Sequence, residues 1–195
     1  MTGSPRLRPT PGQTVGPFFG FALDLPGGAD VVPAGHEGAL RLCGTVWDGA
    51  GAPVPDALIE IWQPGPDGRA PRVPGTLRRD GRFTGWGRCA TDDGGGYRFV
   101  TLTPGASRQG PGPASPGTAA FFAVCVFARG LLDRLHTRAY LPDDAEALAN
   151  DPLLQGITPQ RRSTLIASRE SDDSLRFDIR LQGEGETVFL QFPGA

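Results

Sequence analysis

A nearly continuous apolar run occupies residues 121–128, with the sequence Phe121-Phe122-Ala123-Val124-Cys125-Val126-Phe127-Ala128. A strand without polar alternation is typical of the centre of a sheet, where both faces of the strand are covered. The turn at Arg129-Gly130 ends the run, and residues 135–141 follow it as a further strand. We therefore expect residues 121–128 to form a central strand that is buried on both faces.

Short strands are predicted on both sides of this run. Residues 175–182 alternate strictly between apolar and polar side chains, which indicates a strand with one buried face. Strands at this density with little helix predict an all-β protein with a β-sandwich fold. The other expected strands are residues 40–46, 57–63, 97–102 and 187–192, the last of which is expected to pair across the turn Gly183-Glu184-Gly185.

Helix is expected in only one or two short segments. In residues 143–150, Asp143 is in the N-cap position with Glu146 three residues later, and Asp151-Pro152 ends the helix. Thr158-Pro159 can open one further helical turn.

The first 37 residues are predicted to be an irregular arm. They are rich in Gly and Pro, show no hydrophobic period, and carry separate apolar side chains such as Phe18 and Phe19. Such side chains need a surface to bury against. We therefore divide the chain into an arm at residues 1–37, which contacts a partner subunit, and a sandwich domain at residues 38–195.

Composition narrows the class of protein. With 195 residues the chain is long enough for one well-buried domain, and 29 Gly and 20 Pro fit a turn-rich β protein. A net charge of -2 without a basic stripe argues against nucleic acid binding. No apolar stretch long enough for a membrane span or a secretory signal is present. Cys43, Cys89 and Cys125 are widely spaced, which fits buried free thiols in the cytoplasm.

Side chains that could carry catalysis are few. The chain has two His and two Tyr, in unrelated contexts, and no HxH or HxxxH metal pattern. We expect His136 to be a hydrogen-bonded structural residue of a strand, and His36 to be solvated. Arg129 follows the apolar run, so its planar guanidinium is expected at the rim of the sandwich. It could hold a carboxylate there, although a surface or interface ion pair is the simpler interpretation.

Five motifs of the sequence belong together. They are Thr10-Pro11-Gly12-Gln13-Thr14-Val15-Gly16-Pro17-Phe18-Phe19, Glu60-Ile61-Trp62-Gln63, Phe127-Ala128-Arg129-Gly130, Gln160-Arg161-Arg162 and Gln182-Gly183-Glu184-Gly185-Glu186-Thr187. With these motifs the chain resembles the intradiol ring-cleavage dioxygenases along nearly its whole length, from Thr10 to Phe192. This resemblance implies a prealbumin-like β-sandwich.

The resemblance also implies where a metal would be held. Catalytic chains of the family bind ferric iron through two Tyr and two His. The positions that match these ligands hold Ala70, Ser107, Phe121 and Ala123 in this sequence. None of them can replace its counterpart as an iron ligand, so the chain is expected to bind no iron there and to be inactive alone.

In heteromeric members of the family the active site lies between two chains, and the resemblance therefore implies a partner subunit that holds Fe(III). The residues of this chain that match the substrate-binding positions are Thr14, Gly16, Pro17 and Arg129. A Gly-Pro pair gives a stiff backbone that can approach an aromatic ring closely. Arg129 would add positive charge near a catecholate that bears a carboxylate.

Two alternatives remain at this point. The chain could be a self-sufficient dioxygenase for another catechol, or a binding or structural module that has kept the sandwich without a catalytic role. The missing ligands count against the first alternative, and the intact segment from Thr14 to Pro17 counts against the second.

Overall fold

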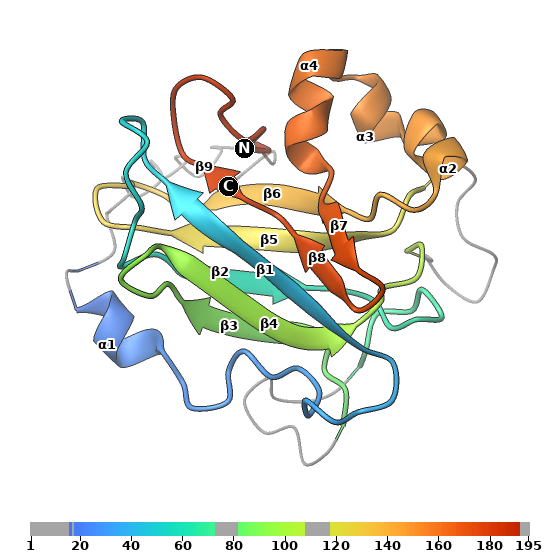
Figure 1. The fold of residues 1–195 in the computed structure, drawn as a ribbon, viewed down its shortest axis with the longest axis horizontal. Coiled ribbons are helices and arrows are strands. Elements are labelled where there is room, and N and C mark those ends of the chain that lie inside the picture. Colours follow the sequence, from blue (N-terminus) through green and yellow to red (C-terminus); the bar gives the residue numbers. More distant parts are fainter. Residues whose placement is uncertain (1–15, 17, 73–81, 108–117, 192–195) are drawn as a thin grey trace, which may run out of the picture.

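Two sheets packed face to face form the body of the protein (Figure 1). The computed structural model describes residues 16, 18–72, 82–107 and 118–191. One sheet has the strand order β4-β1-β8-β7, with β9 also paired to β1, and the other has the order β3-β2-β5-β6. The strands are β1 (Ala39–Trp47), β2 (Leu58–Trp62), β3 (Trp86–Ala90), β4 (Gly96–Leu102), β5 (Phe121–Phe127), β6 (Leu135–Tyr140), β7 (Ser168–Ser171), β8 (Ser174–Arg176) and β9 (Ile179–Arg180).

The core lies between the inner faces of these sheets, and the alternation of the strands explains its composition. In β1 and β4, every second side chain is buried, as in Leu42 and Phe99. Phe122 of β5 and Leu175 of β8 belong to the same cluster of side chains. Full burial of a side chain of this size contributes about 1.5–3 kcal/mol. The predicted all-β sandwich is confirmed.

The helices are short and lie at the ends of the sandwich. They are α1 (Phe19–Leu23), α2 (Ala145–Asn150), α3 (Pro152–Gln155), α4 (Pro159–Arg162) and the 3-10 turn η1 (Ser163–Leu165). Figure 1 shows α1 at one end and α2 to α4 together, away from α1. In the described part of the chain, no helix is long and apolar enough to cross a membrane.

The described part of the N-terminal segment is attached to the sheets. The side chain of Arg88 on β3 donates from Nη1 to the carbonyl of Leu23 at the end of α1, at 3.1 Å. Val31 is buried in the core, and its amide donates to the carbonyl of Val100 on β4 at 2.8 Å. Residues 29–32 of the predicted arm therefore pack on the sandwich, whereas residues 1–15 and Pro17 lie outside the described residues.

The prediction that residues 121–128 are buried on both faces is wrong. β5 is an inner strand of its sheet, as expected, but buried side chains alternate along it with half-buried ones. Phe122, Val124 and Val126 enter the core, whereas Phe121 and Ala123 lie on the outer face of the sheet. A strand with one buried face is normally recognised by alternating apolar and polar residues. The outer face of β5 is also apolar, so this alternation is absent from the sequence.

Two local predictions also need correction. Asp144, not Asp143, caps α2 by accepting from the amide of Ala147, because Asp143 forms an ion pair with Arg169. The expected strand 187–192 is not formed in its described part. Its Leu190 makes an isolated bridge to His136 of β6 instead of continuing a hairpin, and only Thr187 bonds back to Arg180.

Gly44 marks the closest approach between β1 and the C-terminal segment. A Cβ atom built at this residue would lie 1.9 Å from the carbonyl oxygen of Phe177 and 2.9 Å from the hydroxyl oxygen of Tyr97. The buried hydroxyl of Tyr97 donates to the same carbonyl at 2.5 Å. Burial raises the pKa of Tyr97 well above its usual range, so this phenol stays protonated as a donor.

We expect Gly44→Ala to destabilise the fold by about 3 kcal/mol or more, because an added methyl group must displace backbone atoms in a closely packed region. Urea unfolding followed by circular dichroism measures the change. Gly35→Ala is the matched control, since a Cβ at Gly35 meets nothing within 4 Å. Equal stability of the two variants would contradict the role of the close contact.

Candidate functional site

The outer face of β5 carries two of the four positions at which the resemblance places metal ligands. Phe121 and Ala123 are two residues apart, and both are half-buried on the same face. The strand register sets Ala123 opposite Trp62 of β2 on one side and Arg138 of β6 on the other. Because directly paired residues of neighbouring strands point to the same side of a sheet, Arg138 lies on the same outer face as Phe121 and Ala123.

The other two positions lie in loops that follow β2 and β4. These loops touch at Gly105, whose amide donates to the carbonyl of Gly65 at 3.0 Å. A Cβ on Gly105 would lie 2.3 Å from the carbonyl oxygen of Pro66, so only glycine fits. Of the two loop positions, Ser107 is half-buried and Ala70 is exposed.

A cavity of about 310 Å³ brings Ser107 and Phe121 together. The guanidinium carbon of Arg138 lies 4.0 Å from the centre of the Phe121 ring, a cation–π distance. The cavity is lined by Ser107, Thr118, Phe121, Arg138, Asp151, Pro152 and Leu153.

Tyr140 and Asp151 form a chain of hydrogen bonds that begins at Arg138. Nη1 of Arg138 donates to the hydroxyl of Tyr140 at 2.9 Å, and that hydroxyl donates to Oδ1 of Asp151 at 3.1 Å. Burial raises the pKa of Tyr140 to about 12, although the guanidinium of Arg138 lowers it. The phenol is therefore protonated and acts as a hydrogen-bond donor between a cation and a carboxylate.

These residues do not fit a ferric ion. Of the four side chains at the matching positions, only that of Ser107 has an oxygen atom, and those of Ala70, Phe121 and Ala123 are hydrocarbon. A guanidinium on the same face would also repel a metal cation. In the part of the chain that the structure describes, no group of three or more His, Cys, Asp or Glu side chains could hold a metal ion.

Of the residues expected to bind substrate, the two that the structure describes, Gly16 and Arg129, lie at the other end of β5. Arg129 follows that strand, and its Nε donates to Oδ2 of Asp56 at 2.7 Å in an exposed ion pair. Gly16 is exposed just before α1, while Thr14 and Pro17 are outside the described residues. In Figure 1, α1 and the turn after β5 lie at the same end of the sandwich.

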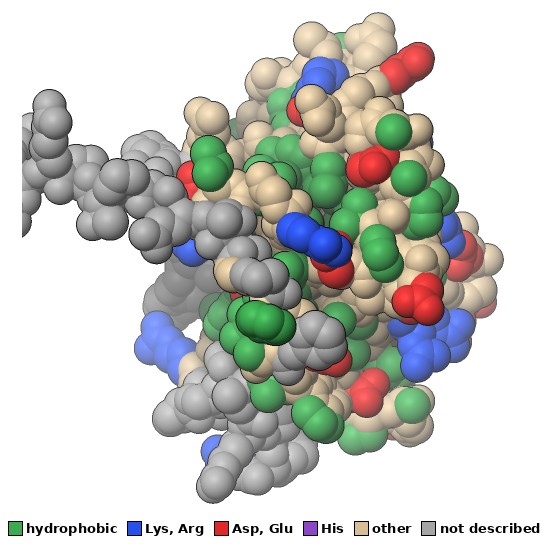
Figure 2. Space-filling view, turned by 90° about the vertical axis from the view of Figure 1, so that its left-hand side faces the viewer, with side chains coloured by type: hydrophobic (Ala, Val, Ile, Leu, Met, Phe, Trp, Pro, Cys, Tyr) green, Lys and Arg blue, Asp and Glu red, His purple; other side chains and the backbone are tan. Residues whose placement is uncertain are grey.

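This end of the protein presents hydrophobic groups to solvent. In Figure 2, which faces this end, hydrophobic side chains lie at the surface among Arg, Asp and Glu side chains. Phe18, before α1, is 74% exposed, and Leu132, in the turn after β5, is 67% exposed. Exposed apolar groups of this size are typical of surfaces that meet another protein.

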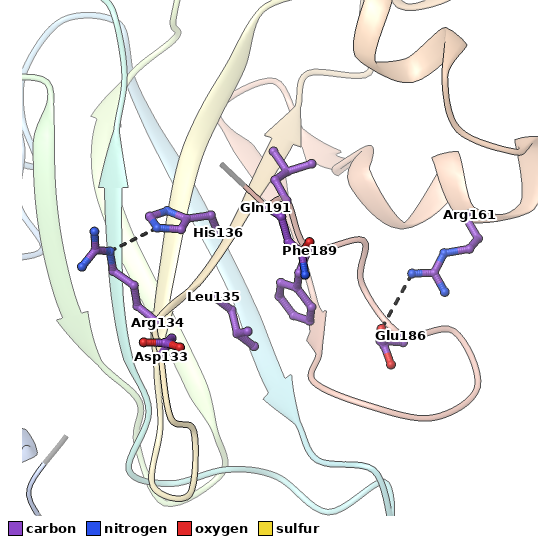
Figure 3. A pocket seen from close by; sticks show the side chains of 9 residues that line it. Asp133, Arg134, Leu135, His136, Arg161, Glu186, Phe189 and Gln191 are labelled. Carbon is purple, nitrogen blue, oxygen red and sulfur yellow. Dashed lines mark hydrogen bonds and ion pairs between the residues drawn. The ribbon is translucent and has the colours of Figure 1, made fainter. Parts of the chain in front are cut away.

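A second cavity, of about 720 Å³, lies beside the start of β6 (Figure 3). Arg134 and His136 lie on one side of it in the figure, and Arg161 and Glu186 on the other. Asp133, Leu135, Phe189, Leu190 and Gln191 complete its lining.

His136 of this cavity has the structural role predicted from the sequence. Nε of Arg134 donates to its Nε2 at 3.1 Å, and its Nδ1 lies 3.1 Å from Sγ of Cys125 on β5. Burial, with a smaller contribution from the positive Arg134, lowers the pKa of His136. Arginine can only donate, so Nε2 accepts and the proton of the neutral ring lies on Nδ1.

The three cysteines are free, as expected, but none is fully buried. Burial raises the pKa of each thiol, so none is an activated nucleophile. The residue that sequence reasoning missed is Arg138. The alternation of Arg134, His136 and Arg138 already placed these three side chains on one face, but the partner across the strand could not be read without the register.

Comparison with known proteins identifies the class. The model of a dioxygenase family matches residues 29–183. This match covers most of the chain, which therefore belongs to the intradiol ring-cleavage dioxygenase family. Within the family it is similar to the alpha chain of protocatechuate 3,4-dioxygenase from Pseudomonas putida, with 37% identity over 95% of this chain and 98% of that chain. The alpha chain from Burkholderia cepacia is 36% identical over 94% of this chain and 98% of that one.

More distant relatives agree with this assignment. The beta chain from Burkholderia cepacia is 36% identical over 76% of this chain and 66% of that one. Among solved structures, the dioxygenase domain of a carbohydrate-binding fusion protein from Streptomyces sp. SirexAA-E matches with a TM-score of 0.60 and 26% identity, over 90% of this chain and 99% of that one. The predicted fold of the family is confirmed.

The positive charge of Arg134 lowers the pKa of His136, and a substitution can test this effect. We expect Arg134→Gln to raise the pKa of His136, because the variant removes the positive charge that disfavours protonation of the ring. Proton NMR titration of the imidazole measures the change, and Arg161→Gln, which removes the other arginine of the cavity, should leave the pKa of His136 unchanged.

The sign of the pH dependence follows from the same shift. The folded pKa of His136 lies below its unfolded value of about 6.5, so this residue binds fewer protons in the folded state. Its contribution to stability is complete above the unfolded pKa and declines as the pH falls below it. An unchanged His136 midpoint in Arg134→Gln would overturn this account.

Proposed function

We propose that this chain is the metal-free, alpha-type subunit of a heteromeric protocatechuate 3,4-dioxygenase. The enzyme would cleave 3,4-dihydroxybenzoate with O2 between the two hydroxyl-bearing carbons to give 3-carboxy-cis,cis-muconate, taking up both oxygen atoms. An iron-bearing beta subunit is its partner, in a cytoplasmic oligomer of alpha and beta chains. The family uses Fe(III), and in this proposal the partner holds it.

The observation that carries this proposal is the replacement of all four ligand positions in a chain that keeps the family fold. Ala70, Ser107, Phe121 and Ala123 cannot bind iron as two Tyr and two His do. Similarity along 95% of the chain to an alpha chain supports a subunit role rather than loss of function. The exposed apolar groups beside α1 supply a surface for a partner.

In this assembly the chain contributes to substrate binding and not to the redox step. Thr14, Gly16 and Pro17 of the arm would border the pocket of the partner and exclude water from it. The guanidinium of Arg129 would bind the carboxylate of the substrate, which it can approach because its side chain is 73% exposed. Binding by Arg129 requires it to leave Asp56 or to share its donors.

The first prediction concerns iron. We expect the chain purified alone to contain no stoichiometric iron and to cause no O2 uptake with 3,4-dihydroxybenzoate. Co-expression with a beta chain should give a complex with one iron per alpha–beta pair and ring-cleaving activity. Metal analysis and oxygen electrode measurements test this. A coloured, active ferric protein obtained from this chain alone would establish a self-sufficient dioxygenase instead, and absence of any stable partner would favour a structural module.

The second prediction separates two roles of Arg129. If Arg129 binds the substrate, Arg129→Ala in the complex should raise KM for 3,4-dihydroxybenzoate about tenfold or more, since a charge-assisted hydrogen bond contributes about 1.5–3 kcal/mol. The iron content should not change. Asp56→Ala removes the ion pair but keeps the guanidinium, so its KM should stay the same or fall.

The comparison with Asp56→Ala decides the outcome. Equal effects of Arg129→Ala and Asp56→Ala on KM, or no effect of either, would reduce Arg129 to a surface ion pair. Arg98→Ala is a further control, because Arg98 is an exposed arginine on β4 in the other sheet.

A further inference from the structure

The charge of Arg138 has no carboxylate partner in the part of the chain that the structure describes. Among the described residues, its guanidinium donates to the neutral hydroxyl of Tyr140 and forms no ion pair. A guanidinium has five N–H donors. Arg138 therefore retains donors for a further acceptor while it lines the cavity of about 310 Å³.

Asp151 is the one carboxylate among the described residues that line the cavity, and both of its oxygens accept hydrogen bonds from groups other than Arg138. Oδ1 of Asp151 accepts from the amides of Leu153 and Leu154 at the start of α3 and from the hydroxyl of Tyr140. Its Oδ2 accepts from the amide of Ala119 at 3.2 Å. Asp151 is 1% exposed, so it fixes the wall of the cavity and leaves the edge of Arg138 without an anionic partner.

Arg138 is held in place before any ligand arrives. One face of the guanidinium lies against the Phe121 ring, at 4.0 Å from carbon to centroid, and Nη1 is fixed by Tyr140. Its neighbour across the strand is Ala123, whose small side chain takes up little of the space on that face. A preorganised guanidinium loses less side-chain freedom when it binds an anion, and its planar fork matches a carboxylate.

The rest of the cavity suits a flat apolar group. Phe121, Pro152 and Leu153 supply hydrocarbon surface, and Ser107 and Thr118 supply hydroxyl groups at its edge. Its volume is at the small end of the range for ligand pockets, about 300–1,000 Å³, which suits one ring-sized molecule.

We propose that this cavity binds a small aromatic carboxylate, with the carboxylate on Arg138 and the ring against Phe121, Pro152 and Leu153. The site is a non-catalytic binding site of this chain. It lies at the opposite end of β5 from Arg129, and the strand between them spans about 20 Å. The proposal does not depend on the proposed function, because it concerns this chain without iron or a partner.

Calorimetric titration of the full chain with benzoate tests the site. We expect benzoate to bind with one site per chain, and to bind more weakly as salt is added. Benzamide, which has the same ring without the charge, and acetate, which has the charge without the ring, should each bind at least about tenfold more weakly.

Variants locate the binding. Arg138→Gln should weaken benzoate binding at least about tenfold, while Arg138→Lys, which keeps the charge but not the planar fork, should fall between it and the unchanged chain. Arg41→Gln is the matched control, because Arg41 is an exposed arginine of β1 in the other sheet. Thermal unfolding of each variant shows whether it is folded, and Arg138→Lys gives a second reading if Arg138→Gln is not.

Three results would overturn the proposal. These are no benzoate binding at millimolar concentration, equal binding of benzoate and benzamide, and benzoate binding that Arg138→Gln and Arg138→Lys leave unchanged. If benzoate does not bind but Arg138→Gln prevents assembly with the beta chain, Arg138 meets a carboxylate of the partner protein instead. The iron content and activity of the complex are measured in a separate experiment. A negative result with benzoate therefore does not affect the test of the proposed function.

Discussion

Along β5 every second side chain enters the space between the two sheets, and the side chains between them lie on the opposite face. Phe122, Val124 and Val126 contribute to the core, whereas Phe121 and Ala123 are the positions that match metal ligands. Because a strand alternates strictly, the two sets contact different surroundings. Side chains of the outer face can therefore change without a change in the packing between the two sheets.

This separation explains how a chain keeps the fold of an iron enzyme family when the matching positions on β5 hold Phe121 and Ala123. A metal ion that bridges strands and loops also holds them together, so its loss needs other contacts. Here the loops after β2 and β4 meet directly at Gly105, and Asp151 ties Tyr140 of β6 to the start of α3 and to Ala119. Hydrogen bonds between protein groups thus join the two loops to each other, and β6 to α3 and Ala119.

The parts of the fold that depend on short-range pattern could be predicted from the sequence. The alternation in β1 and β4 predicted their buried faces, because one buried face imposes a period of two. The strand predicted over residues 175–182 is two short strands, β8 and β9. Strand β5 was assigned but its outer face was not, since apolar side chains there conceal the period. The segment 187–191 was misassigned because Leu190 bridges to His136, a distant pairing that no local pattern reveals.

The candidate site shows the same limit at the level of single residues. Phe121 and Ser107 could be placed by motif, but their shared cavity depends on long-range contacts that bring β5 beside the loop after β4. Arg138 was missed because an arginine in an alternating strand is normally a solvated side chain. Its position over Phe121 follows from the register of β5 with β6, which sequence alone does not define.

Two arginines at opposite ends of β5 illustrate that surroundings, more than residue type, decide what a cation can do. Arg129 is exposed and paired with Asp56, and an exposed ion pair of this kind contributes about 0–1 kcal/mol, so an arriving carboxylate can replace Asp56 at little cost. Arg138 is half-buried, contacts Phe121 and Tyr140, and has no anionic partner among the described residues. The first arrangement favours a cation that exchanges partners at an exposed surface. The second favours a fixed cation whose unmatched charge, in a partly apolar cavity, gains most from a ligand that brings its own negative charge.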